Sequence, residues 1–212
     1  MIIIKKKNFG FEIPKPFYRE KGDIKCIVLG CDPSSNLAYE KNIGFDTVFG
    51  LSNTDYNNFN KTRDDNKIMY KYFGMIKSNL LKIFKDEETM LNSIYVQNLC
   101  RNYLEQETSK YNIKKWKNFI ISEGYIELLK DEIKPFPKVP ILLTSYYLLY
   151  ALDDDCKAVK YYYDNLKIVK NKELDRELIM FSRCPAYSLK NYSDYCDEIK
   201  NCLKVWKVHD YI

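Results

Sequence analysis

The feature that most constrains this fold is a short apolar run near the amino end, Cys26-Ile-Val-Leu29. Such a run, rich in aliphatic and β-branched side chains, is typical of a strand buried on both faces. Gly30, Cys31, Asp32 and Pro33 follow directly. Because ligands of open α/β sheets bind beyond the carboxyl ends of the strands, Asp32 is a candidate for chemistry. The residue types in Asp-Pro-Ser-Ser are also favoured in turns and at helix N-caps, so Asp32 can equally be a capping or turn residue.

The rest of the chain alternates between apolar runs and helical patterns. Buried strands are predicted over 94–100, 139–144 and 178–183. Apolar residues spaced three and four apart predict helices over 63–84, 116–130 and 192–208, and Ser145 is placed to cap another over 146–152. Residues 1–22 contain prolines and are expected to be extended. This alternation predicts an α/β fold, a three-layer α/β/α sandwich with a mainly parallel central sheet. No linker or repeat divides residues 1–212, so one domain is expected.

Composition excludes several classes of chemistry. The single His209, and the lack of any Cys-x-x-Cys pair, argue against a metal centre and a Ser-His-Asp triad. No glycine-rich nucleotide motif is present, so no cofactor is expected. Seven scattered cysteines are typical of reduced thiols, and no apolar stretch approaches a membrane span. The amino end does not follow the order of a signal peptide, so a cytoplasmic location is expected. A net charge of +5 is compatible with a polyanionic partner.

Polar residues follow three of the predicted strands: Asp32 the first, Asn98 the second, and Arg183 with Cys184 the last. In a parallel sheet these exits share one edge. The loop between residues 31 and 53 is longer than a connection needs, which is typical of functional loops, and it carries Phe49 within a short apolar island.

This set of segments resembles uracil-DNA glycosylases. Gly30-Cys-Asp-Pro33 is similar to the Gly-Gln-Asp-Pro element of that family, and Tyr95-Val-Gln-Asn98 to its Leu-Leu-Leu-Asn strand end. Val48-Phe49-Gly50 resembles the segment whose Phe stacks on the extruded base, and Arg183-Cys-Pro-Ala186 more loosely resembles the final His-Pro-Ser loop. The likeness lies in the order of these elements across residues 24–205.

The resemblance implies a DNA glycosylase that hydrolyses the N-glycosidic bond of uracil or another deaminated or damaged base. It implies a monomer that acts on single- or double-stranded DNA without a cofactor. The implied residues are Asp32 and Cys184 for catalysis, Cys31, Phe49 and Asn98 for base binding, and Ser34, Arg183, Tyr187 and Leu189 for DNA binding. Asp32 would stabilise an oxocarbenium-like sugar and orient water, while the Asn98 amide matches the pairing edge of uracil.

The departure from the family pattern is Cys184, which stands where the family has a His that donates to the base oxygen. Ala186 also replaces a Ser that would contact phosphate. Losing one such donor typically costs about 10²–10³ in rate. The sequence therefore leaves three alternatives: a slow uracil-DNA glycosylase, a glycosylase that acts on a different base, or a protein that has kept the fold and lost the reaction.

Two other interpretations stay open at this point. The first is a nucleic-acid-binding protein without turnover, motivated by Cys184. The second is an unrelated α/β enzyme that uses Asp32 as a base on a small molecule. The single residues also have structural interpretations: Asn98 can satisfy loop backbone, Phe49 can belong to the core, and Arg183 can form a surface ion pair.

Overall fold

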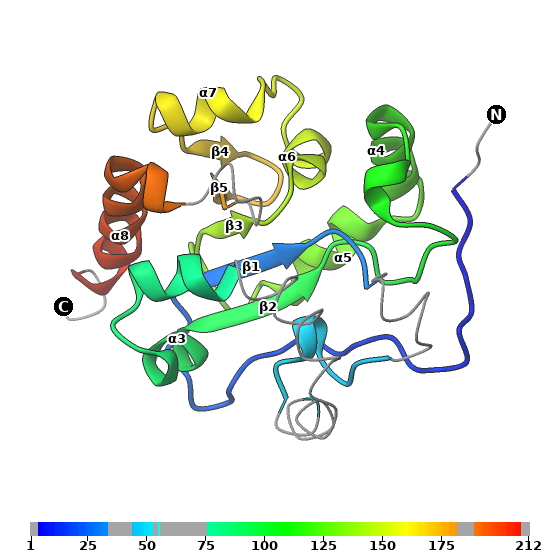
Figure 1. The fold of residues 1–212 in the computed structure, drawn as a ribbon, viewed down its shortest axis with the longest axis horizontal. Helices are drawn as coiled ribbons and strands as arrows, with labels where there is room; N and C mark the ends of the chain where they lie inside the picture. Colours follow the sequence, from blue (N-terminus) through cyan, green and yellow to red (C-terminus); the bar gives the residue numbers. More distant parts are fainter. Residues whose placement is uncertain (1–3, 34–43, 53–54, 56–75, 182–188, 209–212) are drawn as a thin grey trace.

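The computed structural model of this chain describes residues 4–33, 44–52, 55, 76–181 and 189–208. Its centre is a five-stranded sheet (Figure 1), formed by β1 (Cys26–Gly30), β2 (Ile94–Asn98), β3 (Ile141–Leu143), β4 (Val169–Asn171) and β5 (Arg176–Met180). The strand order is β2-β1-β3-β5-β4. All neighbours are parallel except β4 and β5. The α/β fold with a mainly parallel sheet is therefore confirmed.

The two strands predicted to carry the site are adjacent and in register. Gly30 at the end of β1 pairs with Asn98 at the end of β2, and on the other side Leu29 pairs with Leu143 of β3. Every residue of β1 and β2 is buried, which agrees with their apolar sequences. Because parallel strands in register end at one level, the residues that follow β1 and β2 start from neighbouring positions.

Strand β4 was not predicted. It is short, partly exposed and antiparallel to β5. Its Val-Lys-Asn sequence carries too little apolar periodicity to separate a strand from a loop. The last predicted strand was also placed too late, because β5 begins at Arg176 and ends at Met180.

The helices are α3 (Glu87–Ser93), α4 (Ile113–Ser122), α5 (Tyr125–Glu132), α6 (Tyr146–Leu152), α7 (Val159–Asp164) and α8 (Ser193–Val208), with the 3-10 turns η2 (Val48–Gly50), η3 (Thr108–Lys110) and η5 (Leu189–Asn191). Of the helix predicted over 63–84, residues 76–84 are described, and residues 76–83 are helical. Ser145 caps α6 as predicted, since its hydroxyl accepts a hydrogen bond from the Tyr147 N–H at 3.3 Å. Among the described helices, none is both long and apolar enough to cross a bilayer.

The single helix predicted over 116–130 was wrong. Two helices, α4 and α5, occupy this region, and Gly124 separates them with φ of 69°. A residue in this left-handed conformation ends a helix, and glycine adopts it without a side-chain clash. The apolar spacing continues across the break because both helices bury one face, which is why periodicity alone missed it.

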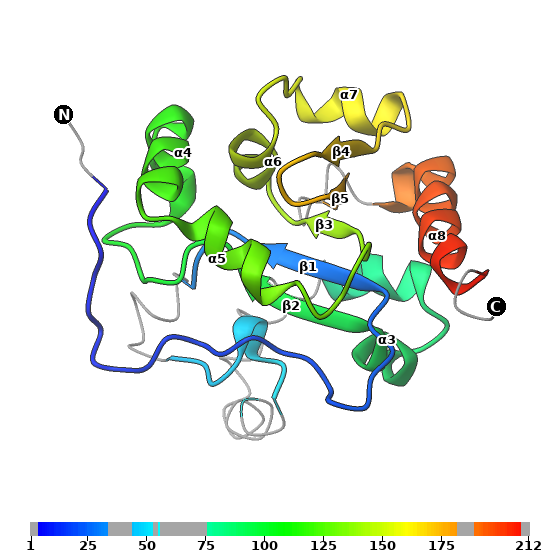
Figure 2. The ribbon, with the colours of Figure 1, turned by 180° about the vertical axis from the view of Figure 1, so that it is seen from behind.

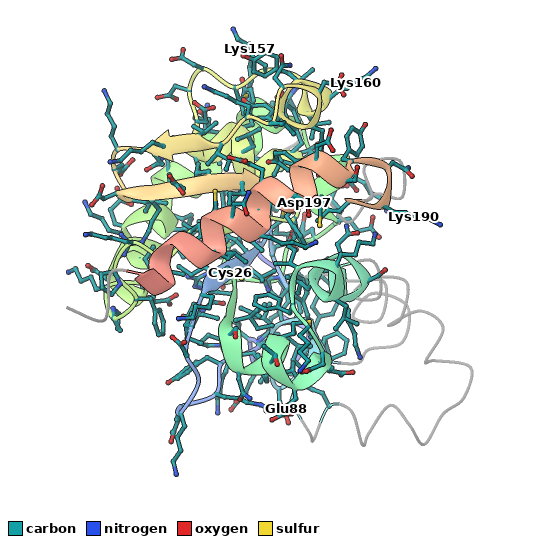
Figure 3. All side chains as sticks on the ribbon, turned by 90° about the vertical axis from the view of Figure 1, so that its left-hand side faces the viewer. Cys26, Glu88, Lys157, Lys160, Lys190 and Asp197 are labelled. Atoms are coloured by element: carbon teal, nitrogen blue, oxygen red, sulfur yellow. The ribbon has the colours of Figure 1, made fainter. Side chains whose placement is uncertain are left out.

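The helices pack around the sheet. Figures 1 and 2 show α5 and residues 76–83 on opposite sides of β1. The core contains large, fully buried side chains from several elements, among them Trp116 of α4 and Tyr195 of α8. Figure 3 shows the charged side chains of Glu88, Lys157 and Lys160 at the periphery, whereas Cys26 of β1 lies inside. The complete three-layer arrangement stays a prediction.

The amino-terminal segment is extended and crosses the free edge of β2. Phe17 and Val96 exchange two backbone hydrogen bonds of 2.9 and 2.8 Å. Two residues earlier, Lys15 accepts from the Val48 N–H at 2.9 Å and donates to the Asp46 carbonyl at 2.8 Å. The segment therefore links the edge of β2 to the turn that contains Phe49.

Candidate functional site

Asp32 lies directly beyond β1, at the edge where the parallel strands end. Its side chain is 5% exposed, and the hydroxyl of Thr108 donates a hydrogen bond to its Oδ2. Thr108 belongs to η3, the turn that follows β2 in the chain. A carboxylate removed from water needs donors in its place, so this contact both stabilises the charge and orients the group.

Asn98 ends β2, directly beside Gly30. Its side chain is 5% exposed, and within the described part of the chain its Oδ1 accepts no hydrogen bond. The backbone N–H of Asn98 donates to Oε1 of Gln97 at 2.8 Å. A buried polar atom without a partner costs about 1–3 kcal/mol, so nearly all such atoms are satisfied in folded proteins. The Asn98 oxygen therefore marks a position where a donor from a ligand would be favourable.

Phe49 lies at the same point, although it is 49 residues before Asn98 in the chain. Its ring is 8% exposed and its backbone is left-handed, with φ of 62°. A β-carbon built on Gly30 would overlap Oδ1 of Asn98 and would lie 3.0 Å from Cζ of Phe49. Both side chains therefore approach the end of β1 closely, and glycine at position 30 makes that approach possible.

Two titratable neighbours of Asp32, Cys100 and Tyr111, are affected by its charge. Burial raises the pKa of the Cys100 thiol to about 12, and the charge of Asp32 adds to this effect. Burial also raises the pKa of Tyr111, with a smaller contribution from Asp32. Both groups are therefore protonated and neutral at neutral pH.

A polar network behind Asn98 holds the end of β2 against α5. Gln97 accepts from the Asn98 N–H and donates through its own Nε2 to Oε2 of Glu132 at 3.2 Å. Arg101 donates to the same carboxylate oxygen at 2.6 Å. All three supporting side chains are at least half-buried, so the network gives Asn98 a rigid base.

No protein-family model and no curated protein matches this chain. The resemblance to uracil-DNA glycosylases therefore depends only on the residues quoted from the sequence.

The remaining predicted site residues have different outcomes. Ser34, Arg183, Cys184 and Tyr187 lie outside the described residues. Cys31 follows β1 as predicted, is half-buried and does not belong to a disulfide. Leu189 is 1% exposed and packs in the core, while its backbone N–H donates to Oδ1 of Asn79 at 3.3 Å. A side chain that wedges into DNA must be exposed, so Leu189 does not suit that role.

Sequence reasoning missed two residues that build the site. Thr108 stands in a polar stretch whose composition does not distinguish it from its neighbours. Thr144 follows β3, and its backbone N–H and hydroxyl both donate to the Leu29 carbonyl, at 3.2 and 2.8 Å. A polar residue after a third parallel strand was a usable signal for Thr144, whereas only the structure brings Thr108 to Asp32. Among the described residues, no group of three or more His, Cys, Asp or Glu is placed to hold a metal ion.

Thr108→Val should lower the free energy of unfolding by about 1–3 kcal/mol, because it removes one hydrogen-bond donor from a buried carboxylate while keeping the side-chain shape. Chemical denaturation at pH 7 measures this. Thr108→Ser, which keeps the hydroxyl, should lose less. Equal stability of T108V and the parent protein would show that the contact contributes nothing.

Proposed function

We propose that this protein is a DNA glycosylase, which hydrolyses the N-glycosidic bond of uracil or another deaminated or damaged base. The observation that carries the proposal is the convergence at the end of β1. The Phe49 ring and the unpartnered Asn98 oxygen both approach Gly30, two residues before the buried carboxylate of Asp32. An aromatic face, an amide and a carboxylate are the groups that recognition and release of an extruded base require.

Each residue has a distinct role in this proposal. The Asn98 oxygen would accept from the imide N–H of uracil, and its amide N–H would donate to the adjacent carbonyl. Phe49 would stack on the base, and backbone amides near Cys31 would bind its other carbonyl. Asp32 would stabilise the positive charge that develops on the sugar and orient the attacking water.

The same proposal includes the partner and the location. The partner is DNA, and Cys184 predicts a slow reaction because a neutral thiol is a weak hydrogen-bond donor. None of the six cysteines in the described part of the chain belongs to a disulfide, namely Cys26, Cys31, Cys100, Cys156, Cys196 and Cys202. Reduced thiols support the cytoplasmic location that the proposal keeps.

A cleavage assay tests the function. Purified protein is incubated with end-labelled oligonucleotides that carry one uracil or one hypoxanthine, in single- and double-stranded form. Alkali then converts any abasic site into a strand break. Cleavage at the position of the modified base, absent from an oligonucleotide with the normal base, supports the proposal. Salt-sensitive binding without cleavage would favour a non-catalytic nucleic-acid-binding protein. Neither cleavage nor binding at low salt would contradict both.

A further inference from the structure

Asp55 accepts four hydrogen bonds from the turn that contains Phe49, and it has no part in the site described above. Its side chain is 3% exposed. Oδ1 accepts from the Asp46 N–H at 2.9 Å. Oδ2 accepts from the N–H and the hydroxyl of Thr47, at 3.1 and 2.9 Å, and from the hydroxyl of Ser52 at 2.8 Å. A buried carboxylate with this many donors is held in one orientation and holds its donors in turn.

The hydroxyl of Thr47 closes the turn from inside. While donating to Asp55, it accepts from the N–H groups of Leu51 and Ser52, at 3.0 and 2.9 Å. The hydroxyl of Ser52 likewise donates to Asp55 and accepts from the Asp55 N–H at 3.0 Å. Residues 46–52 are thereby fastened at both ends to one carboxylate, with Phe49 at the middle of the closed segment.

Phe49 needs such support because its backbone conformation is unfavourable. A φ of 62° is uncommon for a residue with a bulky side chain, and the adjacent Gly50 is left-handed as well, with φ of 64°. Such a conformation persists only where the surroundings determine it. Here it turns the ring toward Gly30, beside the Asn98 amide.

We infer that Asp55 is a positioning residue that holds the 46–52 turn in the one conformation that presents the Phe49 ring to a nucleobase at the end of β1. Asp55 does not itself touch the base. The nature of the ligand rests on the proposed function, whereas the control of Phe49 by Asp55 rests only on the hydrogen bonds of the turn.

The first experiment measures by proteolysis how readily the 46–52 turn opens, and it does not depend on enzymatic activity. Asp55→Asn places an amide NH₂ group opposite donors, so the turn should open more often. Chymotrypsin then cuts the bond after Phe49, and mass spectrometry follows the product. Cleavage there should be about tenfold faster or more in D55N. Asp46→Asn is the matched control, since Asp46 belongs to the same turn with an exposed side chain, and its cleavage should equal that of the parent protein. Equal rates in D55N and D46N would overturn the inference.

The second experiment asks whether Asp55 acts through Phe49. With a uracil-containing single strand, D55N should lower kcat/KM by about ten- to a hundredfold, mainly through KM, because a displaced ring binds the base poorly. In a Phe49→Ala background the same change should have no further effect. If Asp55→Asn lowered kcat/KM as much in the Phe49→Ala background as in the parent protein, Asp55 would not act through Phe49. If the parent protein cleaves no base while D55N opens the turn, the proposed function fails and the control of Phe49 by Asp55 stands.

A milder pair of variants covers the case in which D55N does not fold. Thr47→Val removes the hydroxyl that donates to Asp55 and accepts from Leu51 and Ser52, whereas Thr47→Ser keeps it. T47V should be cut after Phe49 faster than the parent protein, and T47S should behave like the parent. Equal rates of chymotrypsin cleavage after Phe49 in T47V and T47S would overturn the inference, as equal rates in D55N and D46N would.

Discussion

Asp32→Asn should reduce the rate of base release by about 10²–10⁴-fold, the range typical for the loss of a positioned acid or base group. The amide keeps the size of the carboxylate and an oxygen that can accept from Thr108, so the fold should be retained. It loses the negative charge that would stabilise the sugar cation and orient water. Single-turnover measurements on a uracil-containing strand isolate this step from product release.

Asp131→Asn is the control for this experiment. Asp131 is an exposed carboxylate on α5 that pairs with Lys134, so its loss changes the net charge by the same amount away from the site. Its rate should match that of the parent protein. A D32N variant as fast as D131N would show that Asp32 only caps its turn, which is the alternative that the sequence left open.

Gly30→Ala should have the second-largest effect, on both stability and activity. The added methyl group would overlap Oδ1 of Asn98 and press on the Phe49 ring, so at least one of them must move. Overpacking of this kind costs about 1–3 kcal/mol of stability, and displacement of a positioning group can lower a rate by about 10²-fold. Denaturant titration and kcat/KM on the uracil-containing strand measure the two effects.

A double-mutant cycle identifies the cause. In an Asn98→Ala background most of the overlap is gone, so Gly30→Ala should destabilise the protein much less there. An equal loss of stability in both backgrounds would mean that the methyl group disturbs the backbone of β1 rather than the Asn98 side chain.

The parts of the fold that the sequence predicted are those with a strong local signal. β1 and β2 are unbroken apolar runs, and Ser145 is a favoured capping residue in front of an apolar helix. The elements that sequence reasoning missed depend on a tertiary contact or on a single backbone angle. The three residues of β4 become a strand only by pairing with β5. The break between α4 and α5 depends on Gly124, whose left-handed conformation does not alter the apolar spacing.

The candidate site divides in the same way. Residues that directly follow or end a strand, such as Asp32 and Asn98, were placed by the rule that parallel strands end at one edge. Their partners were not, because Thr108 is separated from Asp32 by 76 positions and comes from a polar turn. Asp55 was also missed, since its importance rests on four hydrogen-bond donors within a turn that has no regular periodicity in the sequence.

The strand order has one more consequence. From β1 the chain continues to β2 on one side, whereas from β3 it continues to β4 and β5 on the other, so β1 and β3 are the neighbours at which the winding of the sheet reverses. In doubly wound sheets the connections diverge at such a pair, and the backbone itself forms the receptacle there. Under the proposed function, the binding place and the reacting groups would then come from different parts of the molecule: a change at Asp32 would remove turnover and leave the binding place intact.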